Sequence, residues 1–243
     1  DYRSSRGLGD VYKRQEPMLY HSLTDRQLTR SFAQAVVEGL APDKGLYYPE
    51  QIPSLPQELW LSEEDLNPWN LGAAMMAPLA EGDLKHEDLL DILKDVLNFP
   101  LELHEVEDNV YALELFHGPT HAFKDVGARF LSRVLRRVSD KRLTILVATS
   151  GDTGSAVAQG FLNVPNIDVV ILYPQGRISK IQEQQLTTAG ANIKALEVEG
   201  AFDDCQAMVK AAFLDDALQA ERPLTSANSI NIARWMPQSI YYA

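Results

Sequence analysis

The segment that decides the fold is RLTILVATSGDTGSAVAQGFLNVPNIDVVILYP, residues 142–174. It begins with RLTILVATS, a short apolar run rich in β-branched residues, and it ends with IDVVILYP, which repeats the strand pattern. Between the two runs lie a glycine-containing turn and SAVAQGFL, whose apolar residues have helical spacing. The order of strand, turn, helix and strand predicts a βαβ unit.

The same alternation continues toward the end of the chain. SKIQEQQLTTAG predicts a helix, NIKALEVEG a strand, and DDCQAMVKAAFLDDALQAE a further helix. Strands that alternate with helices form a parallel, doubly wound sheet with right-handed crossovers. We therefore expect residues 101–243 to form an α/β domain.

Residues 18–100 have a helical pattern and predict an N-terminal helical domain. LTDRQLTRSFAQAVVEGLA predicts a helix with Thr24 as N-cap and Gly39 near its end. Asn67 and Pro68 open a second helix, and LKHEDLLDILKDVLNF predicts a third that Pro100 ends. The large apolar residues Trp60, Trp69, Met75 and Met76 are expected in the core, and His86 and His104 on the surface.

The first residues differ from the rest of the chain. DYRSSRGLGDVYKRQ is basic, has no hydrophobic period and lacks the apolar region of a secretory signal. We interpret residues 1–17 as a non-native or disordered tail that resembles a translated sequencing adapter, with Met18 as the native start.

Composition excludes several classes of partner. The chain has 243 residues, 45% of them hydrophobic, and a formal net charge of −12, which disfavours phosphate backbones and anionic lipid surfaces. Cys205 is the single cysteine and cannot close an internal disulfide, and no apolar run reaches the roughly 18 residues that a membrane span needs. We expect a globular, cytoplasmic protein that binds neither nucleic acid nor membranes.

The turn TSGDTGSA, residues 149–156, lies where a doubly wound sheet binds ligands, outside the carboxyl end of a strand. Its glycines permit close backbone approach, and the N–H groups of a helix start attract an anion. The hydroxyls of Ser150, Thr153 and Ser155 could add hydrogen bonds. The turn is neither a Walker loop nor GxGxxG, and a tight, capped strand-to-helix turn without a ligand is the alternative.

One lysine in LELFHGPTHAFKDVGARFLSRVL, residues 113–135, stands directly before a helical pattern. Lys124 follows Phe123, after a loop that contains Gly118 and Pro119. A lysine enclosed by apolar neighbours loses solvation of its charged form, and the neutral, nucleophilic amine becomes accessible for Schiff-base chemistry. The alternative is a lysine that begins a helix and extends to water.

At these residues the sequence resembles a known enzyme family. ELFHGPTHAFKD looks like the lysine segment of pyridoxal-phosphate-dependent threonine synthases, and ATSGDTGSAVA resembles their substrate loop. GLAPDKGLYYPEQIP, residues 39–53, and NSINIARWMPQSIYYA, residues 228–243, are similar to two further segments of the family. The four motifs occur in the family's order.

The resemblance implies a fold type II enzyme that converts O-phospho-L-homoserine and water into L-threonine and phosphate with pyridoxal 5'-phosphate. By position Lys124 matches the lysine that binds the cofactor as a Schiff base and then moves protons, and Phe123 and Asp152 are expected beside the cofactor. The substrate-binding residues implied are Ser150, Gly151, Thr153, Gly154, Ser155, Asn228, Asn231 and Arg234. For Arg234 a surface salt bridge is an equally good interpretation. No metal site is implied.

The sequence departs from the family in three respects. His121 replaces an apolar residue and is expected to cap its loop rather than to face the cofactor. Neither the glycine-rich loop that grips the cofactor phosphate nor the serine or threonine near the pyridine nitrogen is found. We therefore expect a truncated, poorly active N-terminal fragment of unknown oligomeric state.

Two other functional classes stay open. One is a related type II enzyme, either a serine or threonine dehydratase or a β-replacement synthase. The other is a non-catalytic, anion-binding α/β module in which Lys124 is structural.

Overall fold

The structure is a computed structural model and describes residues 17–55, 57 and 67–243. The interpretation of residues 1–17 falls, apart from Pro17, outside the described residues, and so does the expected core position of Trp60. Within the described part of the chain, no helix has both the length and the apolar character to span a membrane.

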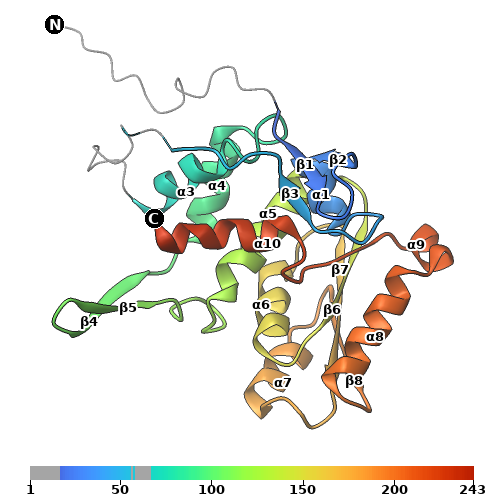
Figure 1. Ribbon diagram of the computed structural model, residues 1–243. Helices are drawn as coiled ribbons and strands as arrows, with labels where there is room; N and C mark the ends of the chain where they lie inside the picture. Colours follow the sequence, from blue (N-terminus) through green and yellow to red (C-terminus); the bar gives the residue numbers. More distant parts are fainter. Residues whose placement is uncertain (1–16, 56, 58–66) are drawn as a thin grey trace, which may run out of the picture.

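The centre of the fold is a parallel sheet of four strands in the order β8-β7-β6-β9 (Figure 1). β6 (Leu143–Ala148) pairs in parallel with β7 (Ile167–Pro174) over its whole length, and α6 (Asp152–Phe161) connects them. β7 pairs in parallel with β8 (Ile193–Val198), and β6 with the short β9 (Leu224–Thr225). The predicted βαβ unit and parallel sheet are confirmed.

Alternating residues of β6 belong to two separate hydrophobic clusters. Ile145 and Val147 belong to the larger cluster, while Leu146 and Ala148 belong to a smaller one that contains Cys205. Because successive side chains of a strand point to opposite faces, both faces of this strand are buried. Its continuous apolar run therefore reflects a sheet covered on both sides.

Helices pack on both faces of the parallel sheet. α5 (Lys124–Val138) and α7 (Lys180–Thr187) both contact α6, which packs on β7. α8 (Phe202–Phe213) packs on β6 and β7 from the side opposite to α6 and α7 (Figure 1). The helix predicted over residues 203–221 is two helices, because Asp215 accepts a hydrogen bond from the N–H of Leu218 and caps α9 (Asp216–Glu221).

The N-terminal region is not purely helical, which corrects the prediction. β1 (Leu19–Ser22) pairs antiparallel with both β2 (Thr29–Ser31) and β3 (Tyr47–Pro49). The predicted N-cap at Thr24 is wrong: Ser31 caps α1 (Phe32–Glu38) in a reciprocal capping box with Gln34, and Gly39 ends the helix as predicted. The residues before Ser31 lie in the turn and strand that precede the helix.

The other two N-terminal helices are confirmed. Asn67 caps α3 (Pro68–Met76), which has proline at its first position. α4 (His86–Val96) buries Leu89, Ile92, Leu93 and Val96. Met76 is buried, whereas Trp69 and Met75 pack half-buried against the core.

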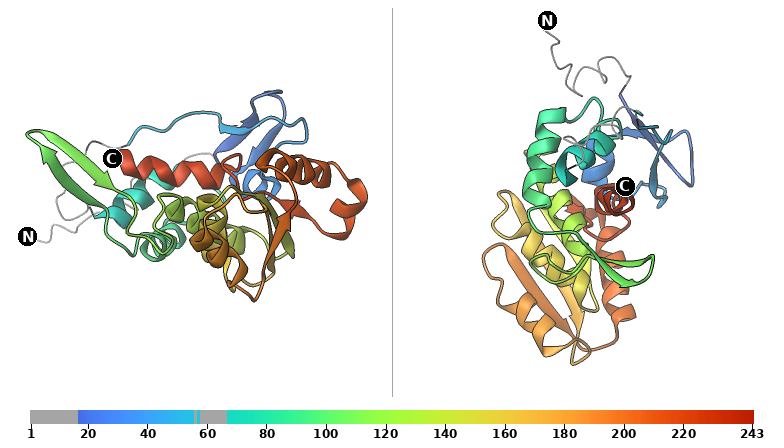
Figure 2. Two further views of the ribbon diagram at one scale, coloured as in Figure 1. Left: turned by 90° about the horizontal axis from the view of Figure 1, so that it is seen from below. Right: turned by 90° about the vertical axis from the view of Figure 1, so that its left-hand side faces the viewer.

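A hairpin and a helical segment late in the chain were also not predicted. β4 (Glu102–Glu107) and β5 (Val110–Glu114) form an antiparallel hairpin that extends away from the sheet (Figure 2). At the end of the chain, α10 (Ile232–Trp235) continues into a 3-10 helix, η2 (Met236–Tyr242). α10 and η2 both contact α5, so residues 232–242 lie against the helix that begins with the candidate lysine, Lys124.

Candidate active site

A hydrogen-bonded loop fixes the start of α5. The buried Asp125 carboxylate accepts hydrogen bonds from the Thr120 N–H at 2.8 Å and from the Thr120 hydroxyl at 2.6 Å. His121 has φ 55°, and its Nδ1 lies 3.1 Å from the carbonyl oxygen of Phe116. His121 therefore closes the loop that leads to Lys124, in agreement with the capping role that we expected.

Lys124 is held beside a carboxylate rather than in an apolar enclosure. Its side chain is 25% exposed, and its Nζ lies 3.8 Å from Oδ2 of Asp152. The Phe123 ring lies 4.6 Å from Nζ and is itself 45% exposed. The expectation of an amine buried among apolar groups is wrong, because one neighbour is charged and the other is open to solvent.

Two residues near the end of the chain, Arg234 and Tyr241, bind the backbone around Lys124 through hydrogen bonds. The buried Arg234 donates from Nε to the carbonyl oxygen of Ala227 at 2.8 Å and from Nη1 to that of Lys124 at 3.1 Å. The Tyr241 hydroxyl donates to the carbonyl oxygen of Phe123 at 2.5 Å. Burial lowers the pKa of Arg234 to about 10 and raises that of Tyr241.

The position of Arg234 differs from both interpretations of the sequence. A surface salt bridge requires an exposed guanidinium, and this one is only 3% exposed. Its two hydrogen bonds go to backbone carbonyls, so the structure gives it a role in holding the start of α5 and not a position on an open substrate wall.

Thr149, which the sequence analysis did not select, builds the glycine turn after β6. Its Oγ1 accepts hydrogen bonds from the N–H groups of Gly151 at 3.0 Å and Gly154 at 2.9 Å. The same hydroxyl lies 3.1 Å from the Gly151 carbonyl oxygen, to which it donates. Gly151 has φ 146°, a value that side chains rarely allow. A threonine at the end of a buried strand and before a glycine was the signal available for this role.

Asp152 links this turn to the lysine. It lies in the first turn of α6, where a negative charge complements the helix dipole. One carboxylate oxygen faces Lys124, and the other accepts a hydrogen bond from Gln182 Nε2 at 2.7 Å. The structure therefore brings the three predicted cofactor contacts, Lys124, Phe123 and Asp152, together with a glutamine that the sequence analysis did not select.

The three hydroxyls of the turn differ in their surroundings. Ser150 is exposed and Thr153 is half-buried, whereas Ser155 is buried. Ser155 Oγ has no hydrogen-bond partner among the described residues, and it lines a cavity of about 230 Å³ with Pro119 and Thr120. The cavity that Ser155 lines does not include Ser150 or Thr153 among its lining residues, so one anion site shared by all three hydroxyls stays a prediction.

The two asparagines have different surroundings. Asn231 is fully buried and caps α10: its Oδ1 accepts from the Ala233 N–H at 3.0 Å, and its Nδ2 donates to the Val36 carbonyl at 2.8 Å. Its amide is thus used within the fold. Asn228 lines a cavity of about 550 Å³ with Ala148, at the carboxyl end of β6, and remains near the edge where ligands bind.

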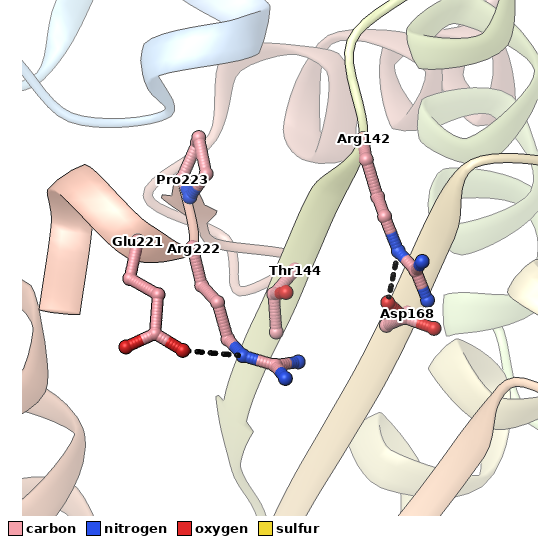
Figure 3. Close-up of a pocket in the computed structure, with 6 residues that line it drawn as sticks. All are labelled: Arg142, Thr144, Asp168, Glu221, Arg222 and Pro223. Carbon is pink, nitrogen blue, oxygen red and sulfur yellow. Dashed lines mark hydrogen bonds and ion pairs between the residues drawn. The ribbon is translucent and has the colours of Figure 1, made fainter.

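A further cavity of about 260 Å³ lies at the opposite, amino end of the sheet (Figure 3). Arg142 and Arg222 line it, but Arg142 pairs with Asp168 at 2.8 Å and Arg222 with Glu221 at 3.7 Å. The neighbouring Arg142 lowers the pKa of Asp168. The charges here are already paired, and the cavity lies away from the ligand-binding edge.

A group of possible metal ligands occurs at the base of the hairpin. The ligand atoms of Glu102, Glu114 and His117 lie within 4.8 Å of one another. His117 Nε2 already pairs with Glu114 Oε2 at 2.7 Å.

Comparison with known proteins supports the resemblance. The family model "Threonine synthase N terminus" matches residues 19–96, and the model "Pyridoxal-phosphate dependent enzyme" matches residues 95–236. Threonine synthase of Haemophilus influenzae is 48% identical over 213 residues, which are 87% of this chain and 50% of the relative. Threonine synthase of Escherichia coli is 44% identical over 230 residues, 93% of this chain and 53% of the relative.

Solved structures agree with these matches. The crystal structure of the Escherichia coli threonine synthase has a TM-score of 0.86 at 43% identity and covers 93% of this chain and 53% of its own. The pyridoxal-phosphate-bound threonine synthase of Brucella melitensis has a TM-score of 0.86 at 37% identity, with 93% and 50% covered. The chain spans about half the length of the curated relatives that it matches. Because the second family model covers more than half of the sequence, the chain belongs to the pyridoxal-phosphate dependent enzyme family.

Proposed function

We propose that this chain carries the lysine-bearing part of a threonine synthase active site, which converts O-phospho-L-homoserine and water into L-threonine and phosphate. The observation that carries the proposal is the approach of Lys124 Nζ to within 3.8 Å of Asp152, at the glycine turn after β6. That turn lies at the carboxyl edge of the sheet, where α/β proteins bind ligands. The match of residues 19–96 to the threonine synthase N terminus supports this activity over other pyridoxal-phosphate chemistry.

The residues present fit pyridoxal phosphate. A primary amine is the group that an aldehyde requires, and the Lys124 side chain is partly exposed and so within reach of a small molecule. Gly151 presents no side chain at the neighbouring turn. Lys124, Phe123 and Asp152 would hold the cofactor, and when bound it supplies a ring that withdraws electrons from the substrate.

Residues of this chain transfer protons and bind the substrate. Lys124 Nζ is the group that takes up and returns protons, and the bonds from Arg234 and Tyr241 to the adjacent carbonyls hold its backbone in place. Ser150 and Thr153, with those N–H groups at the start of α6 that do not donate to Thr149, orient the substrate carboxylate. Asp152 would repel that carboxylate, so we place the carboxylate on the side of the turn away from Asp152.

The binding partner of the enzyme is a small phosphorylated amino acid. The net charge of −12 disfavours binding to nucleic acid and to anionic membranes. We retain the cytoplasmic location suggested by the sequence. The two family models meet at residues 95–96, which supports our division of the chain near residue 100.

Covalent trapping tests the central assignment. The chain is incubated with pyridoxal phosphate, reduced with borohydride and mapped by peptide mass spectrometry. We expect the cofactor on Lys124, no such adduct in Lys124→Ala, and an unchanged adduct in Lys94→Ala, a control at an exposed lysine of α4. Labelling spread over surface lysines, with Lys124 no more modified than Lys94, would contradict the assignment.

A protein of the relatives' length then tests the substrate. Phosphate release from O-phospho-L-homoserine should exceed that from O-phospho-L-serine, because the family resemblance points to the longer side chain. The reverse preference would favour a β-replacement synthase, and trapping without turnover of either compound would favour a binding module.

A further inference from the structure

Gln182 uses both ends of its side-chain amide. In the capping box of α7, its Oε1 accepts a hydrogen bond from the Ser179 N–H at 3.2 Å, while the Ser179 hydroxyl accepts one from the Gln182 N–H at 3.3 Å. Its Nε2 is thereby turned toward α6, where it donates to Oδ1 of Asp152 at 2.7 Å. A single side chain therefore ties the start of α7 to the start of α6.

The glycine turn is shaped to admit this amide. A Cβ at Gly151 would lie 2.5 Å from Gln182 Nε2 and 2.7 Å from its Cδ, closer than non-bonded atoms approach. The φ of 146° at Gly151 also disfavours any side chain. The absence of a side chain at residue 151 is thus what lets the Gln182 amide lie against the turn and reach Asp152.

The other oxygen of Asp152 faces Lys124. An ion pair of this kind, with 56% of the Asp152 side chain and 25% of the Lys124 side chain exposed, is weak unless something restricts the carboxylate. The bond from Gln182 fixes one carboxylate oxygen and so directs the second one at the amine. We propose that Gln182 is a positioning residue, which holds the Asp152 carboxylate against Lys124 and thereby sets the reactivity of that amine.

This inference rests on the proposed function only in that Lys124 is the working amine. Its test therefore uses the cofactor-free chain and does not depend on turnover. The chain is acetylated with a limiting amount of acetic anhydride, and the labelling of Lys124 is measured by mass spectrometry relative to Lys94 in the same molecule. Because an amine held in an ion pair must leave the carboxylate before it can attack the anhydride, loss of the carboxylate neighbour should speed the labelling of Lys124.

We expect Asp152→Asn and Gln182→Met each to raise the ratio of Lys124 to Lys94 labelling by roughly 1.5- to 5-fold, the range of a partly exposed ion pair. The matched control is Gln34→Met, which breaks the same kind of Ser-to-Gln capping box in α1 without contact with Asp152. This control should lower stability about as much as Gln182→Met and leave the labelling ratio unchanged.

Two results would overturn the inference. If Asp152→Asn raises the ratio and Gln182→Met does not, the carboxylate acts without Gln182. If neither variant changes it, the ion pair does not control the amine. Failure of the proposed function has a different signature, since pyridoxal phosphate would then not be trapped on Lys124 of the unmodified chain.

Discussion

Replacement of Thr149 by valine should open the glycine turn. The hydroxyl of Thr149 makes three of the hydrogen bonds that shape it, with the N–H of Gly151, the N–H of Gly154 and the carbonyl of Gly151. Valine has nearly the same shape and none of these bonds. Both glycines are buried, so water does not readily replace the lost acceptor.

The cost follows from the Gly151 N–H, which is left without a partner, whereas the Gly154 N–H still donates to the Gly151 carbonyl oxygen at 3.0 Å. A buried donor that loses its acceptor costs about 1–3 kcal/mol, so Thr149→Val should lower the free energy of unfolding by about 1–3 kcal/mol. For a chain of this size each kcal/mol corresponds to roughly 2–4 °C in melting temperature, which gives a fall of roughly 2–12 °C. Thr149→Ser retains the oxygen and loses only a methyl group, so it should cost about 1 kcal/mol.

Urea and thermal unfolding of the three proteins measure these differences. The matched control is Thr144→Val, on the same strand and also buried, where no side-chain hydrogen bond is seen among the described residues. We expect that control to stay within about 1 kcal/mol of the unmodified chain. If Thr149→Val also stays within about 0.5 kcal/mol, the hydroxyl does not hold the turn and the reasoning fails.

Other predictions concern contacts elsewhere in the fold. In Arg234→Lys a single ammonium cannot bind both carbonyl oxygens, so the free energy of unfolding in urea should fall by about 1.5–3 kcal/mol and cofactor trapping on Lys124 should decrease. Unchanged trapping would show that Arg234 does not hold the backbone of Lys124 in place. Arg142 lowers the pKa of Asp168, so the stability difference between the unmodified chain and Asp168→Asn should be present above about pH 4 and vanish as the pH falls through the folded-state pKa of Asp168. A difference that persists at lower pH would contradict this cause. Thr153→Val in a protein of the relatives' length should raise the KM for substrate at nearly unchanged stability, and a fall in melting temperature alone would make that residue structural.

Local patterns were sufficient to predict three of the four strands of the parallel sheet and most of the helices. β7 lies within the bounds that its apolar run predicts, because a strand covered on both faces leaves a continuous hydrophobic signal. The helix cap at Thr24 was wrongly predicted because Ser31, seven residues later, offers the same chemistry together with a capping-box glutamine. The β4–β5 hairpin was missed since its residues are mostly exposed and carry many charges, so no core-facing alternation marks it.

The candidate site was only partly predictable. Lys124 and Asp152 could be selected from their positions at helix starts, but their pairing depends on how α5 and α6 pack. Gln182 carries no signal of function in the sequence, because its capping role in α7 fully accounts for it there. Its second role appears only when Gly151 and Asp152 are brought against it by the sheet.

The contacts of Lys124 also explain why distant motifs occur together in this chain. Arg234 reaches the carbonyl of Lys124 across 110 residues of sequence, and Tyr241 reaches that of Phe123 across 118. That approach requires a glycine on α5, since a Cβ at Gly127 would lie 2.4 Å from the Arg234 carbonyl oxygen. We expect a change in any one of these residues to displace the backbone that carries the amine. Hydrogen bonds and close packing therefore join the lysine motif to the motif at residues 228–243. The motif at residues 228–243 sets the position of the lysine motif.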